Sequence, residues 1–265
     1  NEKILMTVLI AGGDSFTFGN ELLDCDGINP SIKTWSALLS REFDMKYCCT
    51  AWGGYSNQSI TRSVINACEN FKENDLAVVV MWSYPNRYEF KFAYDTKQRT
   101  GKWGNINPWT TEKDDNVILD AFHNARNNIF KAQKKNIQNA QETGVAEFAE
   151  VFTKHVGGTE YWEMYTTYKE IVFLQNWLDV RNIPYLFTYV DGILFDNHTI
   201  NDADRTMRTL ESSINWDNWY RFDEDLGFYH WAKRNKFPFA TTHPLEPAHE
   251  EFSKQVHYLA SELLT

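Results

Sequence analysis

The stretch ILMTVLIAGGDSFTFG, residues 4–19, decides the fold. Its first half is almost entirely apolar, as in a strand that is buried on both faces of a parallel sheet. The run ends in the turn residues Gly12, Gly13 and Asp14, so Ser15 follows directly after this strand. Ligands of open parallel sheets bind outside the carboxyl ends of the strands. We therefore expect the functional site at this end of the sheet.

Two more apolar runs, each followed by glycine or proline, extend the pattern. Residues 46–51 lead into Gly53 and Gly54, and residues 75–82 form the most strongly apolar run, before Pro85. Apolar residues at helical spacing fill the two connections, residues 31–43 and 56–71. Repeated strand, turn and helix units predict an α/β protein with a parallel sheet and helices on both faces.

The pattern loosens over residues 87–158, which are polar and rich in Asn, Lys and Gln. We interpret this region as an insertion or lid beside the sheet, with a weak helix at 117–142 and with Trp103 and Trp109 suited to a cleft wall. Further elements are expected beyond it: helices at 160–181, 202–215 and 225–235, strands at 183–190 and 237–240, and a last helix near Pro247. The prediction is a single domain over residues 1–265 with about five parallel strands.

Composition narrows the classes of function. The 265 residues are 43% hydrophobic and 23% charged, which is ordinary for a globular protein. The net charge is −10 and no basic patch stands out, so we expect no nucleic-acid partner. No apolar run approaches the ~18 residues of a membrane span, and no leader is visible, so a cytoplasmic protein without a membrane partner is expected. Four cysteines and seven histidines lack metal-site spacing, which predicts reduced thiols and no metal.

Ser15 is the candidate nucleophile. A serine after a buried strand presents its hydroxyl at the ligand-binding edge, near backbone N–H groups that can stabilise an oxyanion. Two other glycine-turn chemistries do not fit. A phosphate loop needs a lysine where Asn20 stands, and the α/β-hydrolase turn needs a glycine where Thr17 stands. The remaining alternative is a turn without a catalytic role.

His243 is the candidate general base. It stands between the strand expected at 237–240 and the last helix, so the sheet would bring it to the same edge as Ser15. The alternative is an ordinary surface or core histidine. Asp191, which follows the strand expected at 183–190, is interpreted as a turn residue beside Gly192.

These residues together resemble the SGNH or GDSL hydrolase family, in particular its divergent members in phage genomes. The nucleophile block is similar to GDSFTFG at residues 13–19, and the block with the oxyanion glycine is similar to GYSN at residues 54–57. The histidine block corresponds to His243, Pro244 and the helix after them. The three blocks occur in the family's order and span nearly the whole chain.

The resemblance implies a three-layer, flavodoxin-like fold and hydrolysis of esters by a serine, without a metal or organic cofactor. Ser15 would be the nucleophile and His243 the base and then the acid. The backbone N–H groups of Ser15 and Gly54 would bind the oxyanion. Asp14 and Asn57 belong to the same blocks and are included in the expected site.

The third block departs from the family pattern. It normally reads Gly-x-Asn-Asp, whereas the third strand here runs into Trp82, Ser83, Tyr84 and Pro85. Tyr84 stands at the place of the oxyanion asparagine. We therefore expect Asn86 to supply the side-chain amide, with Trp82 and Tyr84 beside it in the binding site.

The histidine block departs as well, because Ala240 stands where the family has an aspartate, three residues before His243. Asp14 is expected to brace its own turn. We therefore predict that a neutral oxygen from residues 223–242 orients the imidazole, with Thr241 the nearest side chain. A neutral partner stabilises an imidazolium less than a carboxylate does, so slow turnover is expected.

The sequence thus predicts a serine esterase or carbohydrate O-deacetylase that acts through a Ser–His pair on a small-molecule or glycan ester. Its aromatic content of 15%, with 10 Trp, suits a cleft with aromatic walls. The alternative is a catalytically weak module with the same fold, associated with a virion, that recognises surface glycans. Ala240 is the reason for that alternative.

Overall fold

The computed structural model describes residues 6–91, 103–111, 144–195 and 204–265. Its centre is a parallel sheet of four strands in the order β2-β1-β3-β6. The strands are β1 (Val8–Gly12), β2 (Lys46–Cys49), β3 (Leu76–Trp82) and β6 (Tyr185–Tyr189). Every residue of β1 and β6 is buried, as the apolar runs predict. The predicted α/β class with a parallel sheet is therefore confirmed.

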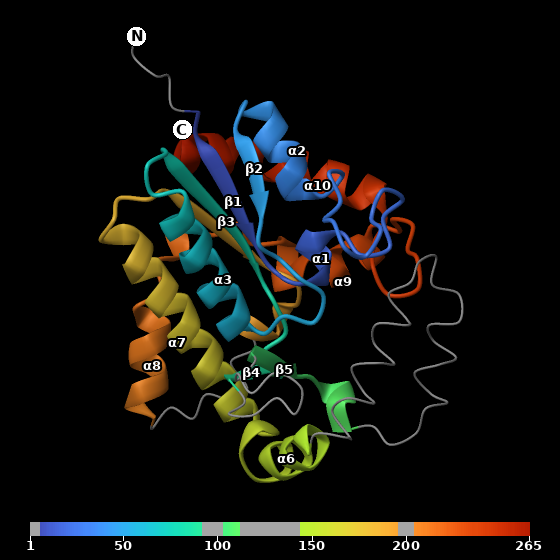
Figure 1. Cartoon of the computed structure of the whole chain (residues 1–265), viewed down its shortest axis with the longest axis vertical. Helices are drawn as coiled ribbons and strands as arrows, with labels where there is room; N and C mark the ends of the chain where they lie inside the picture. The colour runs from blue at the N-terminus through green and yellow to red at the C-terminus, as the bar shows by residue number, and fades with distance from the viewer. Residues whose placement is uncertain (1–5, 92–102, 112–143, 196–203) are drawn as a thin grey trace.

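Helices cover both faces of the sheet (Figure 1). The chain crosses from β1 to β2 in one direction and from β2 to β3 in the other, so right-handed crossovers place α2 (Trp35–Glu42) and α3 (Asn57–Asn70) on opposite faces. On one face α2 packs against α10 (Glu246–Leu264), and on the other α3 packs against α7 (Glu160–Asp179). The result is a three-layer arrangement with the sheet in the middle.

The other described elements lie mainly around the carboxyl end of the sheet or beside the outer helices (Figure 1). They are α1 (Ser15–Phe18), β4 (Tyr88–Lys91), β5 (Trp103–Ile106), η1 (Pro108–Thr111), α6 (Val145–Phe152), the π-helical η2 (Thr153–Gly157), η3 (Gly192–Phe195), α8 (Arg205–Ser212), η5 (Trp216–Asn218), η6 (Asp223–Asp225) and α9 (Gly227–Arg234).

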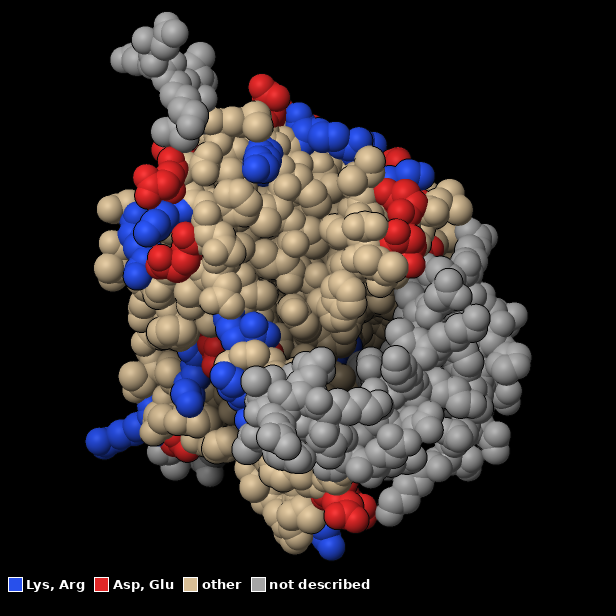
Figure 2. Space-filling view, in the orientation of Figure 1, with Lys and Arg blue, Asp and Glu red and all other residues tan. Residues whose placement is uncertain are grey.

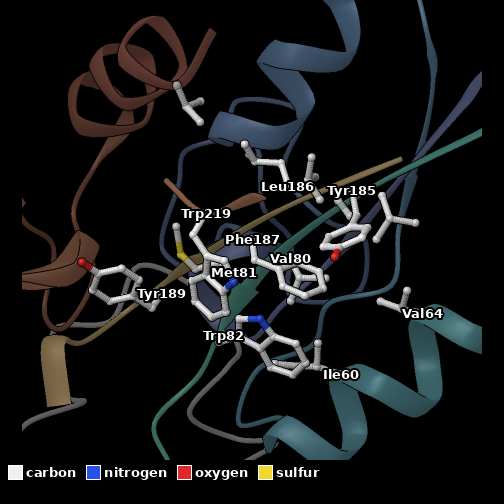
Figure 3. Packing of buried hydrophobic residues seen from close by; sticks show 14 of the residues in the cluster. Ile60, Val64, Val80, Met81, Trp82, Tyr185, Leu186, Phe187, Tyr189 and Trp219 are labelled. Atoms are coloured by element: carbon white, nitrogen blue, oxygen red, sulfur yellow. The ribbon is translucent and has the colours of Figure 1, made fainter. Parts of the chain in front are cut away.

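The core between β3, β6 and α3 is rich in aromatic side chains, and it contains Trp82. The Trp82 indole meets the Phe187 ring edge to face at 5.3 Å and points toward Ile60 of α3 (Figure 3). Its side chain is completely buried. The expectation that Trp82 lines the binding site is therefore wrong, because the last residue of β3 still faces the helix layer.

The strand expected at 237–240 does not form in the described part of the chain. Phe239 makes an isolated antiparallel bridge to Pro244 instead, within a tight return of the chain. Pro238 and Pro244 lack the N–H that a ladder needs, and the N–H of Leu245 donates to the Pro238 carbonyl at 2.9 Å. The sheet of the described residues thus has four strands, and a loop carries His243.

The described part of residues 87–158 includes the β4–β5 hairpin, which packs near the start of α3 at the carboxyl end of the sheet (Figure 1). The Ser56 N–H and the Ser59 hydroxyl both donate to Asn105 Oδ1, and Arg62 makes two hydrogen bonds to the Glu89 carboxylate. The helix expected at 117–142 lies outside the described residues, and the lid role stays a prediction.

Within the described ranges, no helix is both long and apolar enough to cross a membrane. Acidic and basic side chains are interspersed over the face shown in Figure 2. The cytoplasmic or virion-associated location expected from the sequence stays a prediction.

Candidate active site

Ser15 begins α1, the single helical turn that follows β1. Asp14 caps this turn, since its Oδ1 accepts a hydrogen bond from the Phe16 N–H at 3.0 Å. Gly19 ends the turn in the left-handed region, with φ 82°, and donates its N–H to the Ser15 carbonyl at 3.0 Å. Gly13 has to be glycine, because a Cβ there would lie 2.6 Å from the Thr17 Cβ. The turn thus fixes the Ser15 side chain at the end of a central strand.

The chain brings His243 to Ser15 across the site. His243 Nε2 lies 2.8 Å from Ser15 Oγ, within hydrogen-bond distance, as the sequence predicts. The imidazole also packs on the Phe16 ring, with 4.7 Å between the centroids. A turn holds the loop, because the Ala240 N–H donates to the His243 carbonyl at 3.0 Å. The pair is formed without the predicted fifth strand.

The other imidazole nitrogen faces a carboxylate, which corrects the expectation of a neutral partner from residues 223–242. His243 Nδ1 lies 2.7 Å from Glu21 Oε2. The backbone N–H groups of Thr241, Thr242 and His243 donate to the same carboxylate at 3.1, 2.9 and 3.1 Å. The Thr242 hydroxyl donates to it as well, at 2.9 Å, and lies 2.8 Å from Nδ1. Glu21 therefore takes the place that Ala240 leaves empty.

The surroundings of Glu21 keep its carboxylate charged. Its side chain is only 5% exposed, and that of His243 is 13% exposed. Burial by itself raises the carboxyl pKa, but the hydrogen bond and charge of His243 and the donors of Thr242 outweigh burial and lower the pKa of Glu21 to about 2. A buried carboxylate with this many donors is able to orient the imidazole and to stabilise its positive charge.

Glu21 was missed because no sequence spacing links it to His243, 222 residues away. It lies in the polar segment after α1 and has φ 68°, which is unusual for a glutamate. That backbone conformation is visible only in the structure. A glutamate in a loop rich in Asp, Asn and Gly is otherwise unremarkable.

Asp14 braces the nucleophile turn, as expected. Besides capping α1, its Oδ2 accepts hydrogen bonds from the Ser83 hydroxyl at 2.6 Å and from Arg87 Nη1 at 2.7 Å. Arg87 Nη1 also donates to Ser83 Oγ at 2.8 Å. This buried ion pair ties the nucleophile turn to the loop after β3. Arg87 was not singled out from the sequence, because an arginine in a loop gives no signal of burial.

Asn57 lies behind the site rather than in contact with its opening. It is buried at the start of α3, where its Oδ1 accepts from the Ser83 N–H at 2.9 Å. Its Nδ2 donates to the Ser83 carbonyl at 3.2 Å and to Thr167 Oγ1 at 3.0 Å. Both polar atoms of the Asn57 amide thus bond to the backbone of Ser83, and the amide nitrogen also bonds to Thr167. The expectation of a binding role for Asn57 is corrected to a clamp on the backbone.

The remaining predicted residues lie on two neighbouring loops. Gly54 has φ 80° in a turn closed by the Tyr55 N–H and the Trp52 carbonyl at 3.1 Å. Tyr84 packs under the Arg87 guanidinium, 4.8 Å from its ring centroid, and burial raises the pKa of its phenol. Asn86 is exposed in the turn that follows. Their roles in oxyanion binding stay predictions.

A second histidine near the loop, His249 of α10, has a structural role. It is buried, and its Nδ1 accepts the Trp35 N–H at 3.3 Å, which joins α10 to α2. Burial lowers the pKa of His249 to about 3, so the ring is neutral.

No cluster of three or more His, Cys, Asp or Glu side chains in the described segments is arranged to hold a metal ion.

No protein-family model and no curated protein matches the chain. Among solved structures, it is similar to the psychrotrophic esterase EstA from Pseudoalteromonas sp., with 11% identity over 97% of both chains and a TM-score of 0.44. An acetyl xylan esterase from the rumen bacterium Butyrivibrio proteoclasticus has 11% identity over 99% of this chain and 66% of its own, with a TM-score of 0.44.

A third similar structure is a lipolytic-type protein from Desulfitobacterium hafniense, with 8% identity over 95% of this chain and 98% of its own and a TM-score of 0.39. Two of these three structures are thus described as esterases. The third carries the name of the G-D-S-L family, the family that the sequence of this chain resembles.

Proposed function

We propose that the protein is an ester hydrolase in which Ser15 is the nucleophile, His243 the general base and acid, and Glu21 the orienting acid. One observation carries the proposal. The Ser15 hydroxyl, the two imidazole nitrogens and the Glu21 carboxylate form an unbroken chain with separations of 2.8 and 2.7 Å. This is the arrangement that a serine needs in order to become a nucleophile at neutral pH.

The proposed reaction has two halves. Nε2 of His243 takes the Ser15 proton while Oγ attacks the acyl carbon, and the resulting imidazolium returns this proton to the alcohol as the ester C–O bond breaks. A water molecule then attacks the acyl-serine in the same way, which releases the acid and restores Ser15. Nδ1–H of His243 donates a hydrogen bond to the Glu21 carboxylate throughout, so the tautomer with an unprotonated Nε2 is favoured before each attack.

Backbone N–H groups are the proposed oxyanion donors. The Ser15 N–H stands at the start of α1, and the Gly54 N–H lies in the loop after β2. Asn86 remains the proposed side-chain amide, and Tyr84 a neighbour of the site. The substrate class proposed is an acyl ester of a small molecule or a carbohydrate, bound within a single domain that includes residues 87–158 as its insertion.

The alternative of a catalytically weak binding module loses its main support. That alternative rested on Ala240, since a histidine without an acid is a poor base. Glu21 supplies a carboxylate at 2.7 Å from Nδ1, so turnover is expected to be ordinary rather than slow.

A fluorophosphonate probe tests the proposal. The probe is expected to label the parent protein at Ser15, as read by mass spectrometry of the labelled peptide, and to block hydrolysis of p-nitrophenyl acetate. Ser15→Ala should abolish both signals, whereas the control Ser63→Ala, on α3, should retain both. Labelling at another residue, or full activity in Ser15→Ala, would contradict the assignment.

A further inference from the structure

Two tryptophans of the described residues expose large parts of their side chains. Trp52 is 45% exposed and Trp103 is 50% exposed. The Trp103 ring is covered by two cations, with the Arg62 guanidinium 4.8 Å and the Lys91 ammonium 5.7 Å from its centroid. Trp52 instead meets the Phe18 ring at 5.0 Å and an interplanar angle of 69°. An aromatic edge on one side leaves much of the Trp52 indole open to a ligand.

Trp52 is close to two parts of the proposed reaction centre, the oxyanion donor Gly54 and the helical turn of Ser15. It precedes Gly53 and Gly54 in the loop after β2, and the Gly54 N–H is a proposed oxyanion donor. Its ring partner, Phe18, belongs to the same helical turn as Ser15. The Trp52 indole is thus one ring contact away from the helical turn that carries Ser15.

The loop that carries the indole is held in place by its surroundings, and the indole itself rests against Phe18. The Trp52 carbonyl accepts the Tyr55 N–H at 3.1 Å, and Phe18 is buried. The Asn20 side chain packs against Gly53, where a Cβ would lie 2.9 Å from Nδ2. A ring that is fixed before binding loses little conformational freedom when a ligand stacks on it.

We propose that Trp52 is a platform for the ring face of a carbohydrate, the alcohol part of the ester, and this inference rests on the proposed hydrolase function. A half-exposed indole is an open surface, whereas an acyl chain gains most in an enclosed apolar pocket. A pyranose ring places its C–H face on the indole and turns its hydroxyl groups outward. The neighbouring polar groups, the Asn20 amide and the bare backbone of Gly53 and Gly54, suit those hydroxyls.

Two acetate esters separate platform binding from catalysis. Release of acetate from an acetylated methyl xyloside and from glycerol triacetate is measured with the parent protein and with Trp52→Ala. For the sugar ester, Trp52→Ala should raise KM about three- to tenfold, the size of one lost aromatic contact. For glycerol triacetate, kcat/KM should change by less than about twofold. For the sugar ester, Trp52→Phe, which keeps a ring against Phe18, should have a KM between those of the parent and of Trp52→Ala.

Phe173→Ala is the control, because it removes an aromatic side chain that is 55% exposed on the outer helix α7, and it should leave both substrates within about twofold of the parent. Equal losses on both esters in Trp52→Ala would mean that the ring only supports the catalytic loop, and no loss on either would mean that it binds nothing. Phenyl acetate is measured in parallel as an aryl ester, and a loss confined to it would assign the platform to aryl esters. Each of these three results overturns the proposal.

Binding without turnover keeps this inference separate from the proposed function. Methyl xyloside is titrated into Ser15→Ala and into Ser15→Ala with Trp52→Ala, with tryptophan fluorescence as the readout. A saturable change that disappears in the double variant supports the platform even where Ser15 is not labelled by the fluorophosphonate. Labelling and triacetate hydrolysis with no saturable change would overturn the platform alone.

Discussion

Two buried carboxylates flank Ser15, and their partners differ. Asp14, on one side, is paired with Arg87, a permanent cation, and fixes the loop after β3. Glu21, on the other side, is paired with His243, whose second nitrogen lies 2.8 Å from Ser15 Oγ. Both carboxylates collect several donors, so their geometry alone does not separate their roles. The two partners indicate different roles: the carboxylate paired with arginine holds a structure, whereas the carboxylate paired with the imidazole is, in the proposed function, the acid that orients the base.

The largest effect expected from this comparison is on turnover. Glu21→Gln should reduce kcat for p-nitrophenyl acetate about 10³- to 10⁴-fold, as acid-to-amide changes do in well-studied serine triads, because an amide does not stabilise the imidazolium. The melting temperature of the variant shows whether it is folded. A folded Glu21→Gln protein with kcat within tenfold of the parent would remove Glu21 from the mechanism.

Loss of the Asp14–Arg87 ion pair should lower the stability of the fold. Arg87→Met leaves the Asp14 charge buried without its ion pair, so the free energy of unfolding should fall by about 3–5 kcal/mol, as measured in urea. The control Arg234→Met breaks the exposed pair with Glu224 and should cost less than about 1 kcal/mol. Similar losses in the two variants would show that the Asp14 pair is no more important to the fold than a surface contact.

The acid dependence of stability should distinguish Glu21 further. The carboxyl pKa is about 2 in the folded protein against an ordinary 4.5, so its contribution is complete above pH 4.5 and is lost as the pH falls toward 2. Its full size is on the order of 3 kcal/mol. The fall in unfolding free energy between pH 5 and pH 3 should therefore be smaller in Glu21→Gln than in the parent.

An exposed glutamate gives the control for that measurement. Glu73→Gln should show the parental fall between pH 5 and pH 3, because Glu73 lies on the surface after α3. If Glu21→Gln and Glu73→Gln fall by the same amount, the buried contacts of Glu21 do not contribute to acid sensitivity.

The smallest effect is expected at Ala240. Because Glu21 already occupies Nδ1 of His243, Ala240→Asp alone should change kcat by less than about threefold, in place of the acceleration that a missing acid would predict. In the Glu21→Gln background the same substitution should recover at least about tenfold, since the two acids serve one nitrogen. A large gain from Ala240→Asp in the parent would show that Glu21 orients the imidazole poorly.

A feature of the fold could be predicted from the sequence where a short stretch of the chain determines it. After Asp75, residues 76–82 are all apolar, and a run of that kind is typical of a buried parallel strand. The Ser15–His243 pair was predicted partly for the wrong reason: Ser15 does follow β1, but the strand expected before His243 does not form, and a loop brings the imidazole to Ser15. Trp82 was misplaced because a strand buried on both faces gives no alternation that would tell which way its last side chain points.

The missed features depend on contacts between distant segments. Glu21 reaches His243 only after the segment following α1 has folded against the loop before α10, and no propensity or spacing encodes that meeting. Residues 237–240 read as a strand because they are short and mostly apolar, but Pro238 lacks the N–H for a ladder. Burial of Arg87 likewise follows from Asp14, across 73 positions of sequence.

The three residues of the proposed site come from two segments of the chain, and two of the three come from the same one. Ser15 and Glu21 come from one short segment, six residues apart, while His243 arrives with the segment that leads into α10. One segment of the chain thus supplies the proposed nucleophile and its acid, and a distant segment supplies the imidazole together with the donors that hold the Glu21 carboxylate. The proposed ester hydrolysis is thus expected to report the docking of α10 against α2, and the two segments form a pair for a split-enzyme complementation sensor.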